Sequence, residues 1–230
     1  MSDWVLRMPW SGEQAAETEP LVTREWLVTN GLGGYASGTV AGLTSRRYHG
    51  LLIASLPAPL GRQVMLNHLS ELVRLPDNTK AFLGGEENTG GVAVPGAAFL
   101  TEFRLDRGLP VWHYKVRDIV IEKRVLLPHR QNSVHISYRL IAGDGPVRLK
   151  LRPAVHFRGY EEAVNAGHPG PYKISAIEDM YEIHGDPERP PLRLNLFGWR
   201  TAFTVESSQL RDVRYRVEAS RGYESEGHLY

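Results

Sequence analysis

Alternation of apolar and polar residues over short stretches is the feature that most constrains how this 230-residue chain can fold. The alternation runs through residues 133–140, 147–155 and 213–219. Successive side chains of a β-strand point to opposite faces, so a period of two places an apolar face on a core and a charged face outside. We therefore predict a half-buried strand at each of these three positions.

A β-hairpin is predicted at residues 111–127, because Arg117 and Asp118 interrupt two runs rich in β-branched and aromatic residues. Segments rich in glycine and proline separate the other runs and are typical of turns. Convincing helical periodicity is nearly absent. The predicted fold class is all-β, a large antiparallel β-sandwich in which one face of each sheet contacts solvent or another domain.

The domain organisation follows from what the chain lacks. We find no internal repeat and no linker rich enough to separate two domains. The start of the chain is polar and carries no strand pattern. Residues 1–20 are predicted to form a partly ordered N-terminal arm, and residues 21–230 a single β-sandwich domain.

Charge and composition exclude several classes of protein. The 27 basic residues are balanced by 26 acidic ones, so no overall field attracts nucleic acid or an acidic membrane. Cysteine is absent, which excludes disulfides and thiolate metal sites. No metal-ligand spacing, phosphate loop or nucleophile elbow is present, so we expect no metal and no cofactor. Because the sequence shows neither a signal peptide nor a membrane-spanning run, we expect a cytoplasmic protein with no membrane partner.

A glycine loop occupies residues 30–35, with the sequence NGLGGY. Asn-Gly is a strong signal for a hairpin turn. Gly33 and Gly34 would also let a partner approach the backbone closely, and their N–H groups could face a pocket. The spacing is not that of a dinucleotide-binding motif. From these residues alone, a turn is the favoured interpretation.

A cationic turn follows at residues 46–49, with the sequence RRYH. Arg46 and Arg47 offer planar forks of donors, Tyr48 offers a stacking face with a polar tip, and His49 titrates near neutral pH. Sugar binding uses this mixture, since hydroxyls need polar partners and the apolar ring face packs on an aromatic. The alternative is a strand start with solvated cations. The apolar run after this turn lacks alternation, so its strand is predicted to be covered on both faces.

Catalytic carboxylates cannot be selected from the sequence, although glycoside hydrolysis needs two of them across a cleft. Glu161 and Glu162 are adjacent and would point to opposite faces of a strand. Glu224 and Glu226 lie together near the end of the chain. We therefore predict no catalytic residue in this chain.

The stretch from residue 25 to residue 53 resembles the signature of the N-terminal domain of bacterial and archaeal glycogen debranching enzymes of the amylo-α-1,6-glucosidase type. That pattern reads Glu-Trp-Leu, Asn-Gly-x-Gly-Gly-Tyr, Thr-x-x-Gly and Arg-x-Tyr-His-Gly-Leu-Leu. Similarity continues to the closing VEASRGYESEGHLY, which resembles the family's Glu-x-x-Arg-Gly-Tyr segment, so it spans nearly the whole chain. The matching residues of the signature are Glu25, Trp26, Leu27, Asn30, Gly31, Gly33, Gly34, Tyr35, Thr39, Gly42, Arg46 or Arg47, Tyr48, His49, Gly50, Leu51 and Leu52.

The resemblance implies a supersandwich of the galactose-mutarotase-like kind. It also implies a catalytic (α/α)₆ helical barrel that follows this domain in the family and is absent from this chain. The chain would then be an accessory domain of a glycoside hydrolase of glycogen catabolism, inactive alone, with the barrel in cis and an α-glucan (glycogen or limit dextrin) as partners. The implied glucan or interface contacts are Asn30, Gly33, Gly34, Tyr35, Arg46, Arg47, Tyr48 and His49, with Trp112 and Arg158 as weaker candidates.

One departure from the family pattern concerns Arg158. An Arg-Asp-aromatic-His run often follows Leu-Arg-Pro in the family, whereas residues 158–161 here read RGYE. If that run helps to form the glucan site, its role is open in this chain.

Two other classes of function stay open at this point. A free-standing sugar epimerase would use a histidine as acid and a glutamate as base. A non-catalytic glucan-binding module would stack sugars on Trp112, Tyr114 or Trp199. The residues that the epimerase could draw on are His113, His135, His156, Glu122 and Glu182.

Overall fold

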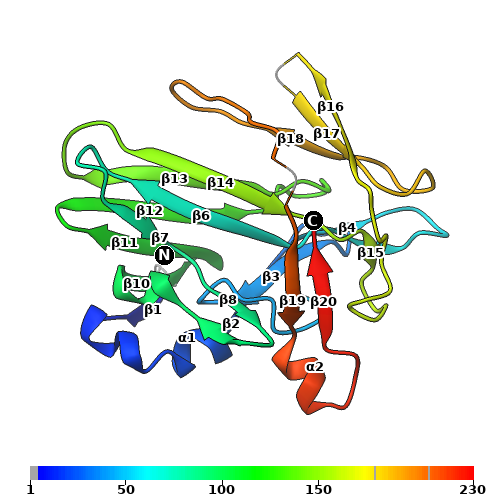
Figure 1. The fold of residues 1–230 in the computed structure, drawn as a ribbon, viewed down its shortest axis with the longest axis horizontal. Helices are drawn as coiled ribbons and strands as arrows, with labels where there is room; N and C mark the ends of the chain where they lie inside the picture. The colour runs from blue at the N-terminus through cyan, green and yellow to red at the C-terminus, as the bar shows by residue number, and fades with distance from the viewer. Residues whose placement is uncertain (1–4, 179, 207) are drawn as a thin grey trace.

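The computed structural model describes residues 5–178, 180–206 and 208–230, and most of its regular secondary structure is antiparallel β-strand (Figure 1). The helices are short: α1 (Glu19–Thr23), α2 (Arg216–Ser220) and two 3-10 helices, Gly12–Ala16 and Pro95–Ala98. The strands are β1 (Val5–Pro9), β2 (Glu25–Thr29), β3 (Tyr35–Thr39), β4 (Gly50–Ser55), β5 (Arg62–Leu66), β6 (His68–Arg74), β7 (Lys80–Phe82), β8 (Glu86–Asn88), β9 (Gly91–Ala93), β10 (Leu100–Asp106), β11 (Leu109–Val116), β12 (Ile119–Leu126), β13 (His135–Ala142), β14 (Arg148–Ala154), β15 (Arg158–Gly159), β16 (Lys173–Ile177), β17 (Met180–His184), β18 (Leu192–Asn195), β19 (Leu210–Arg214) and β20 (Glu226–Leu229).

The described part of the chain forms five sheets, and we name each after a central strand. The β11 sheet has the order β1-β10-β11-β12-β13, the β4 sheet has the order β15-β5-β4-β3-β2, and the β6 sheet has the order β14-β6-β7. The β19 sheet, β20-β19-β8-β9, carries the end of the chain, and the β17 sheet, β16-β17-β18, projects as an arm (Figure 1). The all-β prediction is therefore confirmed.

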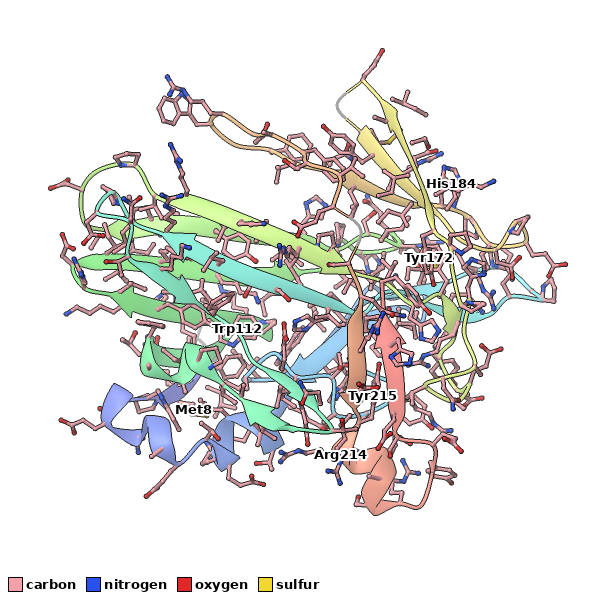
Figure 2. All side chains as sticks on the ribbon, in the orientation of Figure 1. Met8, Trp112, Tyr172, His184, Arg214 and Tyr215 are labelled. Atoms are coloured by element: carbon pink, nitrogen blue, oxygen red, sulfur yellow. The ribbon has the colours of Figure 1, made fainter. Side chains whose placement is uncertain are left out.

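The core lies between the β11 sheet on one side and the β4 and β6 sheets on the other. Trp112 of β11 is 2% exposed and lies inside the fold (Figure 2). Its ring meets that of Trp26 from β2 edge to face, with 5.5 Å between the ring centres. Its indole N–H donates to the Val40 carbonyl at 2.8 Å. Trp112 is therefore a core residue. Its side chain cannot be the platform for sugar stacking that was considered from the sequence.

A buried ion pair joins the β6 and β11 sheets inside this core. Lys123 of β12 places its ammonium 2.7 Å from Glu71 of β6, and both side chains are more than nine-tenths buried. The Tyr138 hydroxyl donates to the same carboxylate, and the ammonium lies 5.0 Å from the centre of the Trp112 ring. Burial of a charge is tolerated only with partners of this kind.

The local predictions for the middle of the chain hold. Strands β11 and β12 form the predicted hairpin, with Val116 opposite Ile119 and Arg117 at a positive φ of 57°. Strands β13 and β14 lie at the stretches predicted at residues 133–140 and 147–155, and burial alternates along both of them as far as Arg139 in β13. Leu140, predicted on the apolar face of its strand, is 45% exposed.

The strand predicted at residues 213–219 is wrong in its second half. Val213 and Tyr215 alternate as predicted and are buried, but Arg216–Ser220 forms α2. The helical turn buries Glu218 completely, and the Val217 N–H donates to the Ser45 carbonyl at 3.0 Å. These contacts with a distant part of the chain outweigh the local alternation.

The N-terminal segment has more structure than a loose arm would have. Strand β1 pairs with β10, from Val5 opposite Asp106 to Pro9 opposite Glu102. A capping box formed by Ser11 and Gln14 begins the 3-10 helix that follows. The first four residues of the predicted arm lie outside the described residues. None of the helices within the described ranges is long and apolar enough to cross a membrane.

Candidate functional site

The glycine loop closes the hairpin between β2 and β3, as predicted, with Thr29 opposite Tyr35. Asn30 is fully buried, and its side-chain oxygen accepts the N–H groups of Leu32 at 2.9 Å and Gly34 at 3.0 Å. Its amide nitrogen donates to the Gln131 carbonyl at 2.9 Å. Asn30 therefore shapes the loop from within and has no surface to offer a ligand.

The glycines of this loop serve two different needs. Gly33 is exposed and has a φ of +96°, a conformation that favours glycine. Gly34 is needed for space, because a Cβ there would lie 2.6 Å from the Asn30 amide nitrogen and 2.9 Å from the Ile53 carbonyl oxygen. The loop thus packs directly on β4, which is buried along nearly its whole length, as predicted.

The cationic turn lies beside this loop, at the entry to β4. His49 is only 2% exposed, and its Nδ1 accepts the Ser45 N–H at 3.1 Å. The proton therefore lies on Nε2, which is 3.6 Å from a Glu25 carboxylate oxygen. The same oxygen accepts the Arg46 Nε–H at 2.6 Å. The histidine and one arginine of the turn are thus tied to the first residue of β2.

Acidification is expected to destabilise the fold through His49. Burial, with help from the Arg46 charge, lowers the pKa of His49 from 6.5 to about 3, so the unfolded chain binds a proton in this range and the folded chain does not. The free energy of unfolding should therefore fall by about 1.5 kcal/mol from this residue as the pH drops from about 6.5 to about 5. Urea denaturation across that range measures it.

The matched control is His49→Asn, whose side-chain oxygen can accept the same Ser45 N–H without titrating. Burial also lowers the pKa of His156, to about 4, and this adds a slope of the same sign. The contribution of His49 is the difference between the wild-type and His49→Asn curves. Parallel curves would contradict the prediction.

Tyr48 is fixed through its backbone and leaves its ring half-buried. Its carbonyl accepts the Tyr35 hydroxyl at 3.0 Å and the Ser37 hydroxyl at 3.3 Å. Its ring lies beside that of Tyr160 at 5.8 Å. Arg62, from β5, donates to the Gly33 carbonyl at 2.7 Å and lies 5.2 Å from the centre of the Tyr160 ring. Four separate segments of the chain therefore meet at this surface.

An open groove of about 480 Å³ lies here, on the outer face of β2 and β3. Both predicted segments border it, and aromatic, cationic, acidic and hydroxyl groups are within its walls. The lining residues are Glu25, Trp26, Leu27, Thr29, Gly33, Gly34, Tyr35, Ser37, Arg46, Tyr48, His49 and Arg62. Six of the eight main candidates thus meet at one groove.

The remaining candidates lie elsewhere. Asn30 is beneath the loop, and the Arg47 guanidinium lies behind the groove, between the rings of Tyr48 at 5.0 Å and Tyr223 at 4.8 Å. Arg158 is fully buried and donates to backbone carbonyls, including that of Arg47 at 2.5 Å. The prediction of Arg158 and Trp112 as weaker ligand contacts is therefore wrong, because both are interior residues.

Six residues that line the groove were not predicted as ligand contacts: Glu25, Trp26, Leu27, Thr29, Ser37 and Arg62. Glu25, Leu27 and Thr29 share the outward face of β2, and Leu27 is 58% exposed there. The period-two pattern could have identified these three residues. The register of the hairpin could have identified Ser37, because it pairs with Leu27. Nothing in the local sequence points to Arg62, which reaches the groove through the pairing of β4 with β5.

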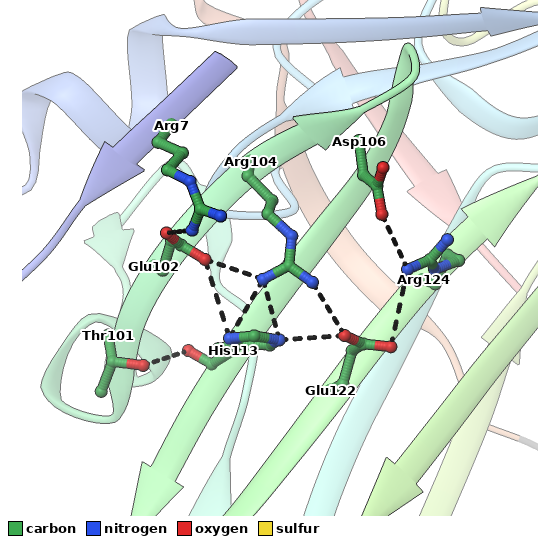
Figure 3. Close-up of polar contacts among 8 residues, drawn as sticks. All are labelled: Arg7, Thr101, Glu102, Arg104, Asp106, His113, Glu122 and Arg124. Atoms are coloured by element: carbon green, nitrogen blue, oxygen red, sulfur yellow. Dashed lines mark hydrogen bonds and ion pairs between the residues drawn. The ribbon is translucent and has the colours of Figure 1, made fainter. Parts of the chain in front are cut away.

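The charged face of the β11 sheet bears on the epimerase alternative. His113 and Glu122 are neighbours across β11 and β12, with Nε2 and a carboxylate oxygen 3.0 Å apart (Figure 3). Arg104 contacts both of these residues and Glu102, and the network continues to the flanking arginines. An acid and a base that contact each other leave no room for a sugar between them.

Of the other groups that such an epimerase could use, His135 is exposed on β13, and the remaining two are paired or buried. Glu182 pairs with Arg193 at 2.8 Å and with His184 at 3.2 Å. His156 is buried beneath Tyr230. Among these five described residues, no histidine and glutamate face each other across a cleft.

Comparison with known proteins assigns the chain to a family. Residues 24–230 match the family model described as glycogen debranching enzyme N terminal. No curated protein and no solved structure gives a significant match. Because the match covers all but the first 23 residues, and includes both segments that border the groove, the chain belongs to the family of glycogen debranching enzyme N-terminal domains.

Proposed function

We propose that this chain is the accessory domain of a glycogen debranching enzyme and that its groove binds α-glucan. The observation that carries the proposal is the convergence of the glycine loop and the cationic turn on one open groove. A hairpin needs the glycines, but it does not need a tyrosine and two arginines gathered at its mouth.

The chemistry of the groove suits a neutral sugar chain. Tyr48 and the exposed Leu27 offer apolar surface to a sugar ring, while Arg46, Arg62 and Glu25 offer donors and acceptors to its hydroxyls. The pKa of Tyr35 is raised to about 12, mainly by burial, so its hydroxyl keeps the proton that it donates to the Tyr48 carbonyl.

The wider role is proposed from family membership. The activity would be that of an amylo-α-1,6-glucosidase on branched glucans, supplied by a catalytic helical barrel in cis, with this domain inactive alone. We also propose that residues 21–230 form one domain, since one core cluster combines residues of the β4, β6 and β11 sheets. The cytoplasmic location stays a prediction.

Replacement of Tyr48 by alanine is expected to weaken glucan binding by about five- to thirtyfold. The substitution removes the aromatic surface at the mouth of the groove, and sugar–aromatic packing of this kind contributes about 1–2 kcal/mol. Isothermal titration of the 230-residue chain with maltoheptaose and with a branched limit dextrin measures the dissociation constants. Circular dichroism of the variant shows whether its fold is kept.

The matched control is Trp199→Ala, since Trp199 is 79% exposed and lies outside the groove. This control should bind both glucans as the wild type does. Loss of binding in Trp199→Ala but not in Tyr48→Ala would move the glucan site to the segment after β18 that carries Trp199. Absence of binding by the wild-type chain at millimolar glucan would overturn the proposal.

A further inference from the structure

The closing motif of the chain has no part in the groove, yet it packs against the cationic turn. Glu218, Arg221, Gly222 and Tyr223 match the Glu-x-x-Arg-Gly-Tyr segment noted in the sequence. Gly222 has a φ of +76°, and the Tyr223 N–H donates to the Glu218 carbonyl at 3.0 Å. The segment is therefore a compact turn at the end of α2. Its glutamate and its tyrosine both contact the same neighbouring residue.

That neighbour is Arg47. The Glu218 carboxylate is fully buried, accepts the Arg47 backbone N–H at 3.2 Å and lies 3.8 Å from the guanidinium Nε. The Tyr223 ring covers the guanidinium at 4.8 Å, with Arg221 5.1 Å from the same ring. A buried carboxylate opposite a cation, and an aromatic face on that cation, are each favourable in a site with little solvent.

Arg47 in turn contacts Tyr48 of the groove. Its guanidinium donates to the Tyr48 hydroxyl at 3.0 Å and lies 5.0 Å from the centre of that ring. Its carbonyl accepts from the fully buried Arg158. Arg47 is thus held at its backbone N–H, its carbonyl and its side chain, and only the last of these contacts faces the groove.

We propose that Glu218 and Tyr223 are positioning residues for the groove: they hold Arg47 so that the Tyr48 ring faces the bound ligand. The two motifs, 171 positions apart, form one unit. This inference rests on the proposed glucan groove, because only a ligand there gives the position of Tyr48 a function.

The test uses the 230-residue chain and two readouts, of which the first needs no glucan. Nuclear magnetic resonance follows hydrogen exchange of the Arg47 amide and the ring signals of Tyr48, assigned with a Tyr48→Phe variant. Glu218→Ala should speed exchange of the Arg47 amide at least tenfold. Both Glu218→Ala and Tyr223→Leu should shift the Tyr48 ring signals, while Tyr223→Phe, which keeps the aromatic face, should leave them at their wild-type positions.

The second readout is the dissociation constant for maltoheptaose. It should rise at least fivefold in Glu218→Ala and Tyr223→Leu and stay at the wild-type value in Tyr223→Phe. Glu224→Ala, an exposed change beside the motif, is the control and should match the wild type in both readouts.

The outcomes separate this inference from the proposed function. If the wild-type chain binds no glucan, the proposed function fails, and the first readout still decides whether the motif holds Tyr48. Unchanged Tyr48 signals in both Glu218→Ala and Tyr223→Leu overturn the inference, whatever the affinities. If Glu218→Ala does not fold, Tyr223→Leu decides, because Tyr223 is 48% exposed and its replacement leaves the core intact.

Discussion

Replacement of Trp112 by alanine is expected to lower the free energy of unfolding by about 3–5 kcal/mol. The side chain lies at the centre of the core, in contact with the rings of Trp26 and Phe103. Its removal leaves a large cavity, and the Val40 carbonyl loses the indole N–H that it accepts. Urea denaturation followed by circular dichroism measures the loss.

Trp199→Ala is the matched control for this change, because it removes the same side chain from an exposed site. Its free energy of unfolding should stay close to the wild-type value. From the sequence, both tryptophans were stacking candidates of one class. Equal losses of stability in the two variants would show that the core assignment of Trp112 is wrong.

Replacement of Lys123 by methionine is expected to cost about 3–5 kcal/mol of stability at neutral pH, because it leaves the buried Glu71 carboxylate without its cation. Methionine keeps most of the volume and the apolar contacts of the lysine stem, so the loss reports the charge and not a cavity. Denaturation midpoints and slopes give the difference in free energy of unfolding.

A double variant separates the charge from the position. Lys123→Met combined with Glu71→Gln removes both charges and keeps an oxygen for the Tyr138 hydroxyl. It should recover most of the stability that Lys123→Met alone loses. If the double variant is as unstable as Lys123→Met alone, the loss of the ion pair is not the reason for the instability of the single variant.

Local patterns predicted the parts of the fold that local interactions decide. The two hairpins, at Arg117 and at the glycine loop, each depend on residues adjacent in sequence, and both are present. Helix α2 could not be predicted in this way, because its one buried turn depends on contacts of Glu218 and Val217 with the segment before β4.

The same distinction between local patterns and long-range contacts applies to the candidate site. The motif residues reach the groove because they lie on neighbouring segments of one sheet, whereas Arg62 arrives through strand pairing that no local pattern encodes. Burial also argues against the ligand contacts that residue type alone suggests for three residues. Asn30, His49 and Arg158 have the chemistry of ligand contacts, but they are almost fully buried and satisfy hydrogen bonds inside the fold.

The contact between Arg47 and Glu218 also sets an order of events during biosynthesis. The turn that carries Tyr48 leaves the ribosome early, but the carboxylate that holds it is 171 residues further along the chain. Contacts of such long sequence separation form late, after the intervening loops have closed. A nascent chain can therefore complete the β2–β3 hairpin long before Glu218 has been made, and on the role proposed for Glu218 the groove is finished only when the last strands of the domain are present.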